Sequence, residues 1–366
     1  MKDWNLHSAR DALSDPGGAL AAEWAELNSD LFDEHPLLSP AFVVPLVRHF
    51  AGPDVLLARW PESGPRRALL LLRPRAAGLW STFLPSQSPI SPALLGPDAD
   101  ITRLLRDLPG AALGVDFLCQ DPLYSGVTGR FQNENREQVR HLTTTAAELT
   151  STFEDYWAAR PKNLRRNMKR YFNRLEASGD QPRLEVHAGL LDAHGGLHRY
   201  GILESAGWKG AAGTAIHPDN AQGRFYADLL GAFGERRCFR VYELYIGDRL
   251  AASRLCVLNR SMLIVLKTTY DEALSQFAPG RVLLYLLLER EFRARELSRV
   301  EFYTNANADS ISWSTTTRDI YHVTHYRMAL MRQVIEGSRP WRQSLRDKFA
   351  RRRPLPESPA DGTEND

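Results

Sequence analysis

The sequence predicts an α/β protein of two domains. At 366 residues with 43% hydrophobic content, the chain is long enough to bury more than one core. Segments 238–246 and 249–258 alternate apolar and polar side chains, and Gly247-Asp248 between them is typical of a two-residue hairpin turn. These two strands are expected to be antiparallel neighbours, with 261–270 as the next strand of the same sheet.

An apolar helix over 280–296 follows these strands, and 300–303 is expected to be a returning strand. A strand, a helix and a second strand in this order form a right-handed crossover. The loop before the helix would then lie at the carboxyl end of the sheet, where α/β proteins bind ligands.

The first part of the chain mixes helices with short strands. We expect helices over 19–32 and 40–50, the second starting at Ser39-Pro40 and distorted by Pro45. The expected strands are 55–59, 67–72, 79–83 and 113–118. The Pro- and Ser-rich segment 85–97 is expected to be a surface loop. No internal repeat is visible in the sequence.

The middle of the chain opens with two helices. Ser151 and Glu154 have the spacing of a capping box at the start of the first helix. The second runs from Pro161 to Ala177 and stops at Gly179. One face of this helix is apolar, and six basic residues occupy most of the rest: Lys162, Arg165, Arg166, Lys169, Arg170 and Arg174.

A strand over 184–188 comes next, followed by a helix that ends near Ala206 and a further helix over 222–233. The first of these helices carries Glu204 in its last turn, just before Trp208-Lys209. A glutamate there is unfavourable for the helix dipole by a few tenths of a kcal/mol, a cost that a binding role would offset.

Charge and cysteine content narrow the function classes. The net charge is only +2, so affinity for nucleic acid or an anionic membrane would depend on local patches, namely the basic helix at 162–174 and the stretch 339–353. The three cysteines, Cys119, Cys238 and Cys256, form no C-x-x-C pair and have no histidines at metal-ligand spacing. We therefore expect no metal site and a reducing, cytoplasmic location. The longest apolar run, 282–288, is too short to cross a bilayer.

A phosphate-binding site is expected at Ala278, Pro279, Gly280 and Arg281. They stand where the third strand gives way to the apolar helix. Backbone N–H groups at a helix N-terminus and a guanidinium group both attract phosphate. The alternative is an ordinary helix start with a solvated arginine.

Several side chains near this loop are candidates for catalysis or substrate binding. Tyr270 is suited to protonate a leaving thiolate or hydroxyl, and Asp271 to orient an incoming amine. Lys267 precedes them on the same strand, where it binds substrate or packs its stem. Glu204 would act as general base with Lys209 gripping an acidic group, or the two would form a surface ion pair of little energetic value.

The order of these residues resembles a known family. Segment 153–327 resembles the GNAT-superfamily domain of polysaccharide-linked acetyltransferases, which are related to the Fem-type aminoacyl transferases. The matching residues are Arg165-Arg166, Arg170, Leu175, Glu204, Trp208-Lys209, Gly247, Leu250-Ala251-Ala252, Lys267, Tyr270-Asp271, Pro279-Gly280-Arg281 and Leu284. Trp24, Leu27 and Ser39-Pro40 resemble the degenerate first half of two-GNAT chains. The chain departs from the family in having Gly280 as the only glycine of the loop, and Ala278 where relatives often have serine.

The resemblance implies two GNAT-like lobes, each a mixed, mostly antiparallel sheet flanked by helices. The expected divisions are a degenerate lobe over 1–145, an acyltransferase lobe over 146–335, and a basic helix with a disordered tail over 336–366. The implied function is transfer of an acyl group, in the first place acetyl, from acetyl-CoA or another acyl-CoA to an amine or hydroxyl. The acceptor would be a sugar, an envelope precursor, a peptide or a small natural product.

Two alternatives stay open from the sequence. The first is an aminoacyl-tRNA-dependent transferase of the Fem kind, in which Arg165, Arg166 and the rest of the basic helix contact tRNA or nucleotide phosphates. The second is a binding protein that keeps the fold without catalysis. The basic helices are also candidates for peripheral contact with a membrane.

Overall fold

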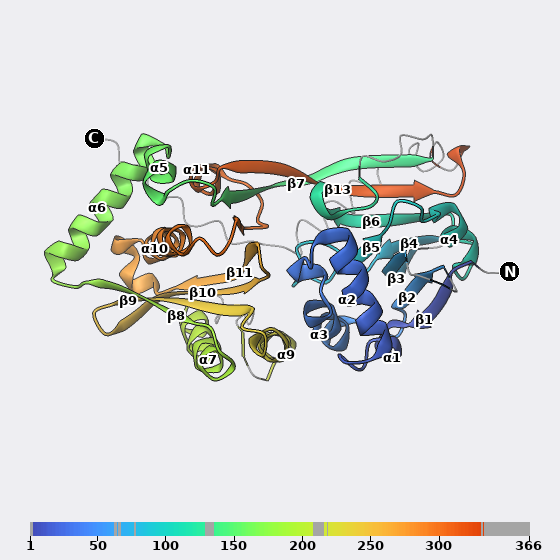
Figure 1. The fold of residues 1–366 in the computed structure, drawn as a ribbon, viewed down its shortest axis with the longest axis horizontal. Coiled ribbons are helices and arrows are strands. Elements are labelled where there is room, and N and C mark those ends of the chain that lie inside the picture. Colours follow the sequence, from blue (N-terminus) through green and yellow to red (C-terminus); the bar gives the residue numbers. More distant parts are fainter. Residues whose placement is uncertain are drawn as a thin grey trace.

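The computed structural model describes residues 3–61, 64, 67–76, 78–128, 135–207, 216–217, 219–330 and 332. They form two halves that share one continuous sheet of 13 strands, with helices on its faces (Figure 1). The sheet is mixed and mostly antiparallel, so the expected fold class is confirmed.

The sheet has five strands of each half on either side of a central pair. The first half supplies β1 (Asn5–Ser8), β2 (Leu56–Trp60), β3 (Ala68–Ala76), β4 (Leu79–Thr82) and β6 (Gly114–Gln120). The second half supplies β8 (Pro182–His187), β9 (Phe239–Ile246), β10 (Arg249–Leu258), β11 (Met262–Tyr270) and β12 (Arg299–Glu301). The central pair is β7 (Arg136–Glu148) and β13 (Thr316–Tyr326), and the short β5 (Ala93–Leu95) pairs with β3.

The strand order reveals an internal repeat that the sequence does not show. From edge to edge the order is β1-β2-β3-β4-β6-β13-β7-β12-β11-β10-β9-β8. Counted inward from the two edges, the strands of both halves follow each other in chain order, so that β1 corresponds to β8, β2 to β9, and so on to β6 and β12. In each half one pair is parallel, β4 with β6 and β11 with β12, and a helix connects its two strands. These helices are α4 (Ile101–Asp107) and α10 (Pro279–Ala294). The two expected GNAT-like lobes are therefore two copies of one topology.

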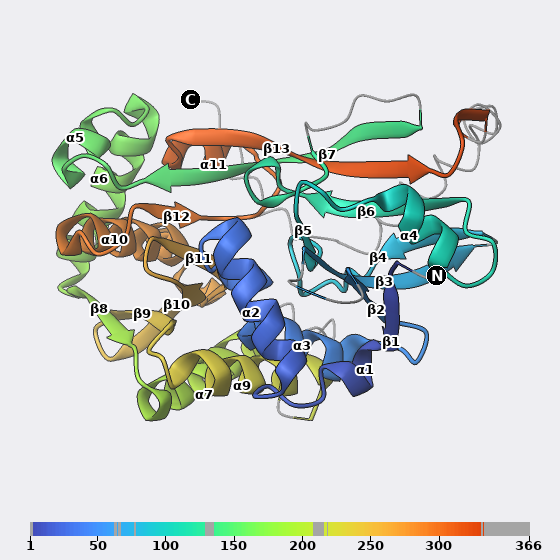
Figure 2. The same ribbon diagram turned by 45° about the vertical axis from the view of Figure 1, so that its right-hand side comes forward.

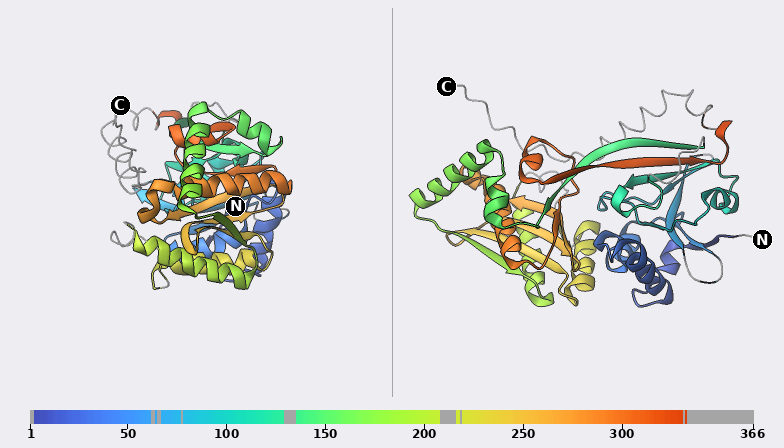
Figure 3. Two further views of the ribbon diagram at one scale, coloured as in Figure 1. Left: turned by 90° about the vertical axis from the view of Figure 1, so that its left-hand side faces the viewer. Right: turned by 45° about the horizontal axis from the view of Figure 1, so that its top comes forward.

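The two repeats exchange their last strands. β7 follows β6 in the chain but pairs with β12 and β13, whereas β13 follows β12 but pairs with β6 and β7. Both strands run side by side along the two halves (Figure 3). The boundary expected at residues 145 and 146 falls inside β7. Neither sequence segment therefore contains all the strands of its half of the sheet.

The helices cover the two faces of the second half separately. One face carries α7 (Leu190–Ala206) and α9 (Ala221–Gly234), and the opposite face carries α10 with α5 (Phe153–Ala158) and α6 (Lys162–Ser178) (Figures 1 and 2). The first half carries α1 (Ala9–Ala12), α2 (Ala19–Phe32) and α3 (Pro40–Phe50) on the side of α9. The short elements are η1 (Pro36–Leu38), η2 (Pro122–Tyr124), η3 (Glu272–Phe277) and α11 (Ala308–Trp313).

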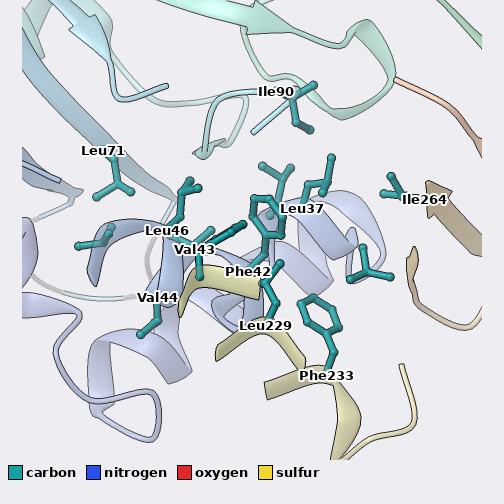
Figure 4. Packing of buried hydrophobic residues seen from close by; sticks show 14 of the residues in the cluster. Leu37, Phe42, Val43, Val44, Leu46, Leu71, Ile90, Leu229, Phe233 and Ile264 are labelled. Atoms are coloured by element: carbon teal, nitrogen blue, oxygen red, sulfur yellow. The ribbon is translucent and has the colours of Figure 1, made fainter. Parts of the chain in front are cut away.

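The largest hydrophobic core joins the two halves. It includes side chains of α2, α3, α7 and α9 together with β9 to β11. The Phe225 ring of α9 makes edge contacts with Phe42 and Phe50 of α3, at centroid distances of 5.7 and 5.3 Å. Phe42, Leu229 and Phe233 lie close together in this core (Figure 4). Since α3 and α9 precede equivalent strands, the lobes pack through equivalent helices.

Two local expectations were wrong. Segment 85–97 is not a surface loop, because Ser88, Ile90 and Ser91 are buried and its last residues include β5. The Ser88 and Ser91 hydroxyls donate to the carbonyls of Ile90 and Leu118, which makes burial of a polar segment possible.

The cap of α5 also differs from expectation. Thr152, not Ser151, accepts the capping N–H, from Asp155, and Glu154 takes no part in the cap. Among the described residues, none of the helices combines the length and the apolar character needed to span a bilayer. The basic stretch 339–353 and the expected tail lie outside the described residues.

A buried polar network also connects the halves. The Arg318 guanidinium of β13 donates to both carboxylate oxygens of Asp121, and Tyr303 O–H donates to Asp121 Oδ2 at 2.8 Å. His35 Nε2 lies 3.1 Å from the Tyr303 oxygen, so it acts as the donor in that bond. Glu301 lies 2.9 Å from Arg318 and is fully buried, which raises the pKa of its carboxyl.

Removing the Phe225 ring is expected to loosen the contact between the halves. Phe225→Ala should lower the free energy of unfolding by about 3–5 kcal/mol, the usual cost of deleting a buried aromatic ring. Ile202→Ala, at a side chain on α7 that is 59% exposed, is the control and should change it by less than about 0.5 kcal/mol. Urea unfolding measures both, and equal effects would contradict the assignment of this core.

Acid should destabilise the protein through His35. Burial, and the nearby Arg318 and Arg299, outweigh Asp121 and lower the pKa of His35 from 6.5 to about 3. Between pH 6.5 and pH 3 the unfolded state therefore binds a proton at His35 and the folded state does not. The free energy of unfolding falls as the pH drops below 6.5, by about 3 kcal/mol at pH 4.

His35→Gln should remove the contribution of His35 to the slope of the free energy of unfolding against pH. His217→Gln, at an exposed histidine, should leave this slope unchanged. The measurement is urea unfolding between pH 4 and 8, and the slopes are compared rather than the absolute stabilities. A slope unchanged in His35→Gln would show that His35 does not titrate in this way.

Candidate functional site

The site is centred where β11 parts from β12. The two strands pair in parallel only at residues 262–264 of β11, so within the described chain no strand pairs with the second half of β11 on that side. On its other side, β11 carries a β-bulge, because Val265 and Lys267 pair with neighbouring residues of β10 and leave Leu266 between them unpaired. A bulge beside an opening between strands leaves a backbone N–H available to an oxyanion.

The bulge also redirects the side chains that follow it. Ile264 and Leu266 pack on the α7 and α9 face, and strict alternation would send Lys267 to the other face. Instead, Lys267 Nζ lies 3.1 Å from Gln222 Oε1 and 3.5 Å from Glu204 Oε1, on the same face. It also lies 5.6 Å from the centre of the Tyr226 ring. The bulge therefore places an ammonium group beside the opening.

Glu204 is buried, with 1% of its surface exposed. It accepts hydrogen bonds from Tyr200 O–H at 3.1 Å and from Ile216 N–H at 2.8 Å, in addition to the contact with Lys267. Among the described residues, the cationic partner of Glu204 is the half-buried Lys267. Trp208 and Lys209 lie outside the described residues.

The expected phosphate loop stands at the N-terminus of α10, at the carboxyl end of β11. Ala278 adopts a left-handed conformation with φ 48° and Pro279 has no N–H. The Arg281 N–H donates to Ala278 O, so within the described chain Gly280 offers the remaining N–H of the first turn. The Arg281 side chain binds Tyr171 O–H of α6 and Asp309 of α11.

A buried arginine that sequence reasoning missed lies beneath this turn. Arg254 of β10 is 9% exposed and donates to Gly280 O at 3.3 Å. Within the described residues it makes no ion pair, and its Nε has no hydrogen-bond partner. Burial lowers the pKa of Arg254 to about 10, so it remains charged at neutral pH. The sequence signal that could have indicated this burial is the position of Arg254 in a strand of mostly small and aliphatic residues.

The basic helix α6 reaches the same loop through a different residue from those expected. The Arg174 side chain donates to Gln276 O, and Arg170 stacks over the Tyr171 ring. Arg165 and Arg166 are exposed nearer the start of the helix, where Arg165 donates to Arg160 O. Among the described residues, Arg254, Arg281 and Arg174 lie around the first turn of α10, together with one carboxylate, Asp309. The structure brings together a net positive charge at this helix N-terminus.

Tyr270 and Asp271 end β11 on the α10 side. The Tyr270 ring is half-buried and lies against Gly280, where an added Cβ would stand 3.7 Å from its Cδ1. Asp271 caps η3 through the Ala273 N–H and pairs with Arg249 at 2.5 Å, so its carboxylate stabilises the loop. Tyr270 and the Lys267–Glu204 pair consequently lie on opposite faces of β11, with the opening between them.

A cavity of about 350 Å³ lies elsewhere, in the first half. It is lined by Ile101, Phe117, Val127, Val323 and His325, among others, and it is remote from α10. It contributes nothing to the candidate site.

Comparisons with known proteins agree with this geometry. No curated protein matches the chain. Among solved structures, FemX aligns with a TM-score of 0.56 at 8% identity, covering 86% of this chain and 98% of its own. The C-terminal domain of a protein from Agrobacterium fabrum, described as a lysylphosphatidylglycerol synthetase, aligns with a TM-score of 0.52 at 12% identity, covering 83% and 92%. At these identities the likeness concerns the fold.

The family comparison places the match on the second half. Residues 162–309 match the family model described as an acetyltransferase (GNAT) domain. The matched segment contains α6, the bulged strand β11, the loop and α10. Residues 162–309 are therefore similar to a GNAT acetyltransferase domain, and the solved structures show a similar fold for most of the chain.

Proposed function

We propose that this protein transfers an acyl group from a CoA thioester to an amine or hydroxyl of a small molecule or saccharide. The observation that carries the proposal is the net positive charge around the first turn of α10. An uncompensated buried cation is unfavourable, and a bound anion at the helix N-terminus would offset that cost. A pyrophosphate is an anion of suitable charge.

The donor would lie along the opening between β11 and β12. Its phosphates would bind the Gly280 N–H with Arg254 beneath and Arg174 beside them. Its acyl arm would extend toward the bulge at Leu266, because the strands leave backbone groups unpaired there. The acceptor would then enter from the α7 and α9 face, where Lys267 and Glu204 lie.

The reaction needs alignment and charge stabilisation more than a covalent intermediate. The acceptor amine or hydroxyl attacks the thioester carbonyl, and the Leu266 N–H would donate to the oxyanion that forms. The intermediate then expels the CoA thiolate, which Tyr270 on the donor side would protonate, and the proton that the acceptor releases would pass through solvent and restore the Tyr270 hydroxyl. We assign Glu204 to holding the Lys267 ammonium in place, because its oxygens already accept three donors.

A second donor class is favoured by one specific observation. All six basic side chains of α6 are exposed, along a helix of 17 residues. Such a surface suits the backbone of an aminoacyl-tRNA, which several phosphate contacts would make strongly salt-dependent. We prefer CoA as the donor because the single buried guanidinium of Arg254 would bind a compact anion at one point, whereas an extended nucleic-acid backbone would need contacts along a surface.

Substitutions of basic residues distinguish the two donors. Arg254→Met should raise the KM for acyl-CoA about tenfold, equivalent to about 1.4 kcal/mol, without lowering the melting temperature, because it removes a buried charge without an ion-pair partner. Arg174→Ala should raise this KM by a smaller factor. Arg166→Ala is the matched control on the same helix and should leave it unchanged.

The direct measurement is thermal unfolding with desulfo-CoA or with a charged tRNA pool. Stabilisation by desulfo-CoA that is lost in Arg254→Met supports the proposal. Stabilisation by tRNA alone, weakened equally by Arg166→Ala and Arg174→Ala, would replace CoA with tRNA as the donor.

The roles within the opening predict separable kinetic defects. Tyr270→Phe should fold normally and lower kcat. Lys267→Met should lower kcat by roughly 10²-fold, because its ammonium would support the Leu266 N–H in stabilising the oxyanion. Glu204→Gln should keep part of the activity, because the amide has the shape of the carboxylate. It should shift the dependence of kcat on pH, because Lys267 loses a negatively charged neighbour. Loss of activity at every pH in Glu204→Gln would instead make Glu204 the general base.

A further inference from the structure

Three metal-ligating side chains meet on the central strands, far apart in sequence. Cys119 of β6, His322 of β13 and His141 of β7 each offer a ligand atom, and these atoms all lie within 4.8 Å of one another. The three strands are adjacent in the order β6-β13-β7. No histidine stands at metal-ligand spacing from Cys119 in the sequence, and it is the strand exchange that brings His141 and His322 close to it.

Two β-bulges flank His322 and bring the other two side chains to it. On the β6 side, Tyr321 pairs with Gln120 and Val323 with Phe117, so His322 faces both Leu118 and Cys119. On the β7 side, the partners of Ile320 and Tyr321 are Leu142 and Arg140, which leaves His141 as the extra residue. Bulges interrupt a ladder and redirect side chains, commonly beside functional sites.

The backbone at Cys119 is strained, which is uncommon for such a residue. Its φ is +45°, in the left-handed region that glycine or asparagine usually occupies. Strain of this kind persists where the surrounding structure imposes it, and often where a site requires it. Cys119 N–H donates to His322 Nδ1 at 3.0 Å, so that nitrogen is unprotonated. An unprotonated imidazole nitrogen is the form that binds a metal ion.

We propose that Cys119, His141 and His322 bind one Zn²⁺ ion at the crossing of the two repeats. A thiolate with two imidazoles is a zinc ligand set, and such ligands stand about 3.3–3.8 Å apart around the ion. Rotation of the exposed His141 ring closes the cluster to this spacing. The ion would take the His322 Nδ1 lone pair from the Cys119 N–H, and the thiol would release one proton as its Zn–S bond forms.

The surroundings are compatible with a cation. Among the described residues, the basic group that acts on His322 is Arg75, and its guanidinium is paired with Asp116. A second group of ligand type, Glu185, His187 and Glu243, carries no such proposal because the Arg199 guanidinium already binds Glu243 and His187.

The proposed ion would tie β6 of one repeat to β7 and β13. His141 is exposed, so solvent would complete a fourth position. The site lies on the central strands and not at α10, so its role would be to stabilise the exchanged strands rather than to act on the acyl donor. Its test is accordingly independent of the acyltransferase proposal.

Cobalt spectroscopy tests the site directly. Full-length protein stripped with chelator is titrated with Co²⁺, and one equivalent should produce tetrahedral visible bands and a thiolate-to-cobalt charge-transfer band. Zn²⁺ should displace both bands and raise the melting temperature. Cys119→Ser should abolish the charge-transfer band, and His141→Ala should weaken binding roughly tenfold or more, since even outer-shell changes cost about 10–100-fold.

Cys238→Ser and His198→Ala are the matched controls, at a half-exposed thiol and an exposed imidazole elsewhere. Both should bind Co²⁺ as the unmodified protein does. Because His141 is exposed, His141→Ala should keep the fold, which circular dichroism checks. Absence of the thiolate band in the unmodified protein, or equal affinity in His141→Ala, would overturn the proposal.

Discussion

The pairing of β7 with β13 is the constraint on which the rest of the structure depends. Each strand belongs by sequence to one repeat and by hydrogen bonding to the other. This exchange joins ten peripheral strands into one sheet and fixes how the two copies face each other. The packing of α3 against α9 and the Arg318–Asp121 network both depend on this arrangement of the two copies.

The second copy alone presents the positively charged helix N-terminus. Its connecting helix α10 begins above Arg254, whereas the equivalent α4 begins at Asp100, which caps its own helix with a carboxylate. A carboxylate at that position repels a phosphate. Two copies of one topology have thus acquired opposite electrostatic properties at the same point, and the residues that match the family model lie in the copy with the positive charge.

Much of the fold could be predicted from the sequence because the signals are local. The hairpin at Gly247-Asp248, the amphipathic α6 and the crossover through α10 all follow from alternation, helical periodicity and turn residues. The bulge at Leu266 and the burial of Arg254 could not be predicted, because both depend on which strand lies alongside. The proximity of Cys119 to His322 likewise arises only from a pairing 203 residues apart. The sequence singled out Glu204, but it did not predict the contact with Lys267, because the bulge and not sequence proximity brings these two residues together.

The position of β13 has a consequence for how the protein is made. This strand lies between β6 and β7, yet it is the last strand of the described chain to leave the ribosome. Until residues 316–326 emerge, β6 and β7 each expose an unpaired edge, and the amino-terminal half stays incomplete although most of its residues were synthesised early. Folding of both halves is thereby postponed until residues 316–326 have been synthesised, and a chain that stops before them would retain two exposed edges prone to aggregation.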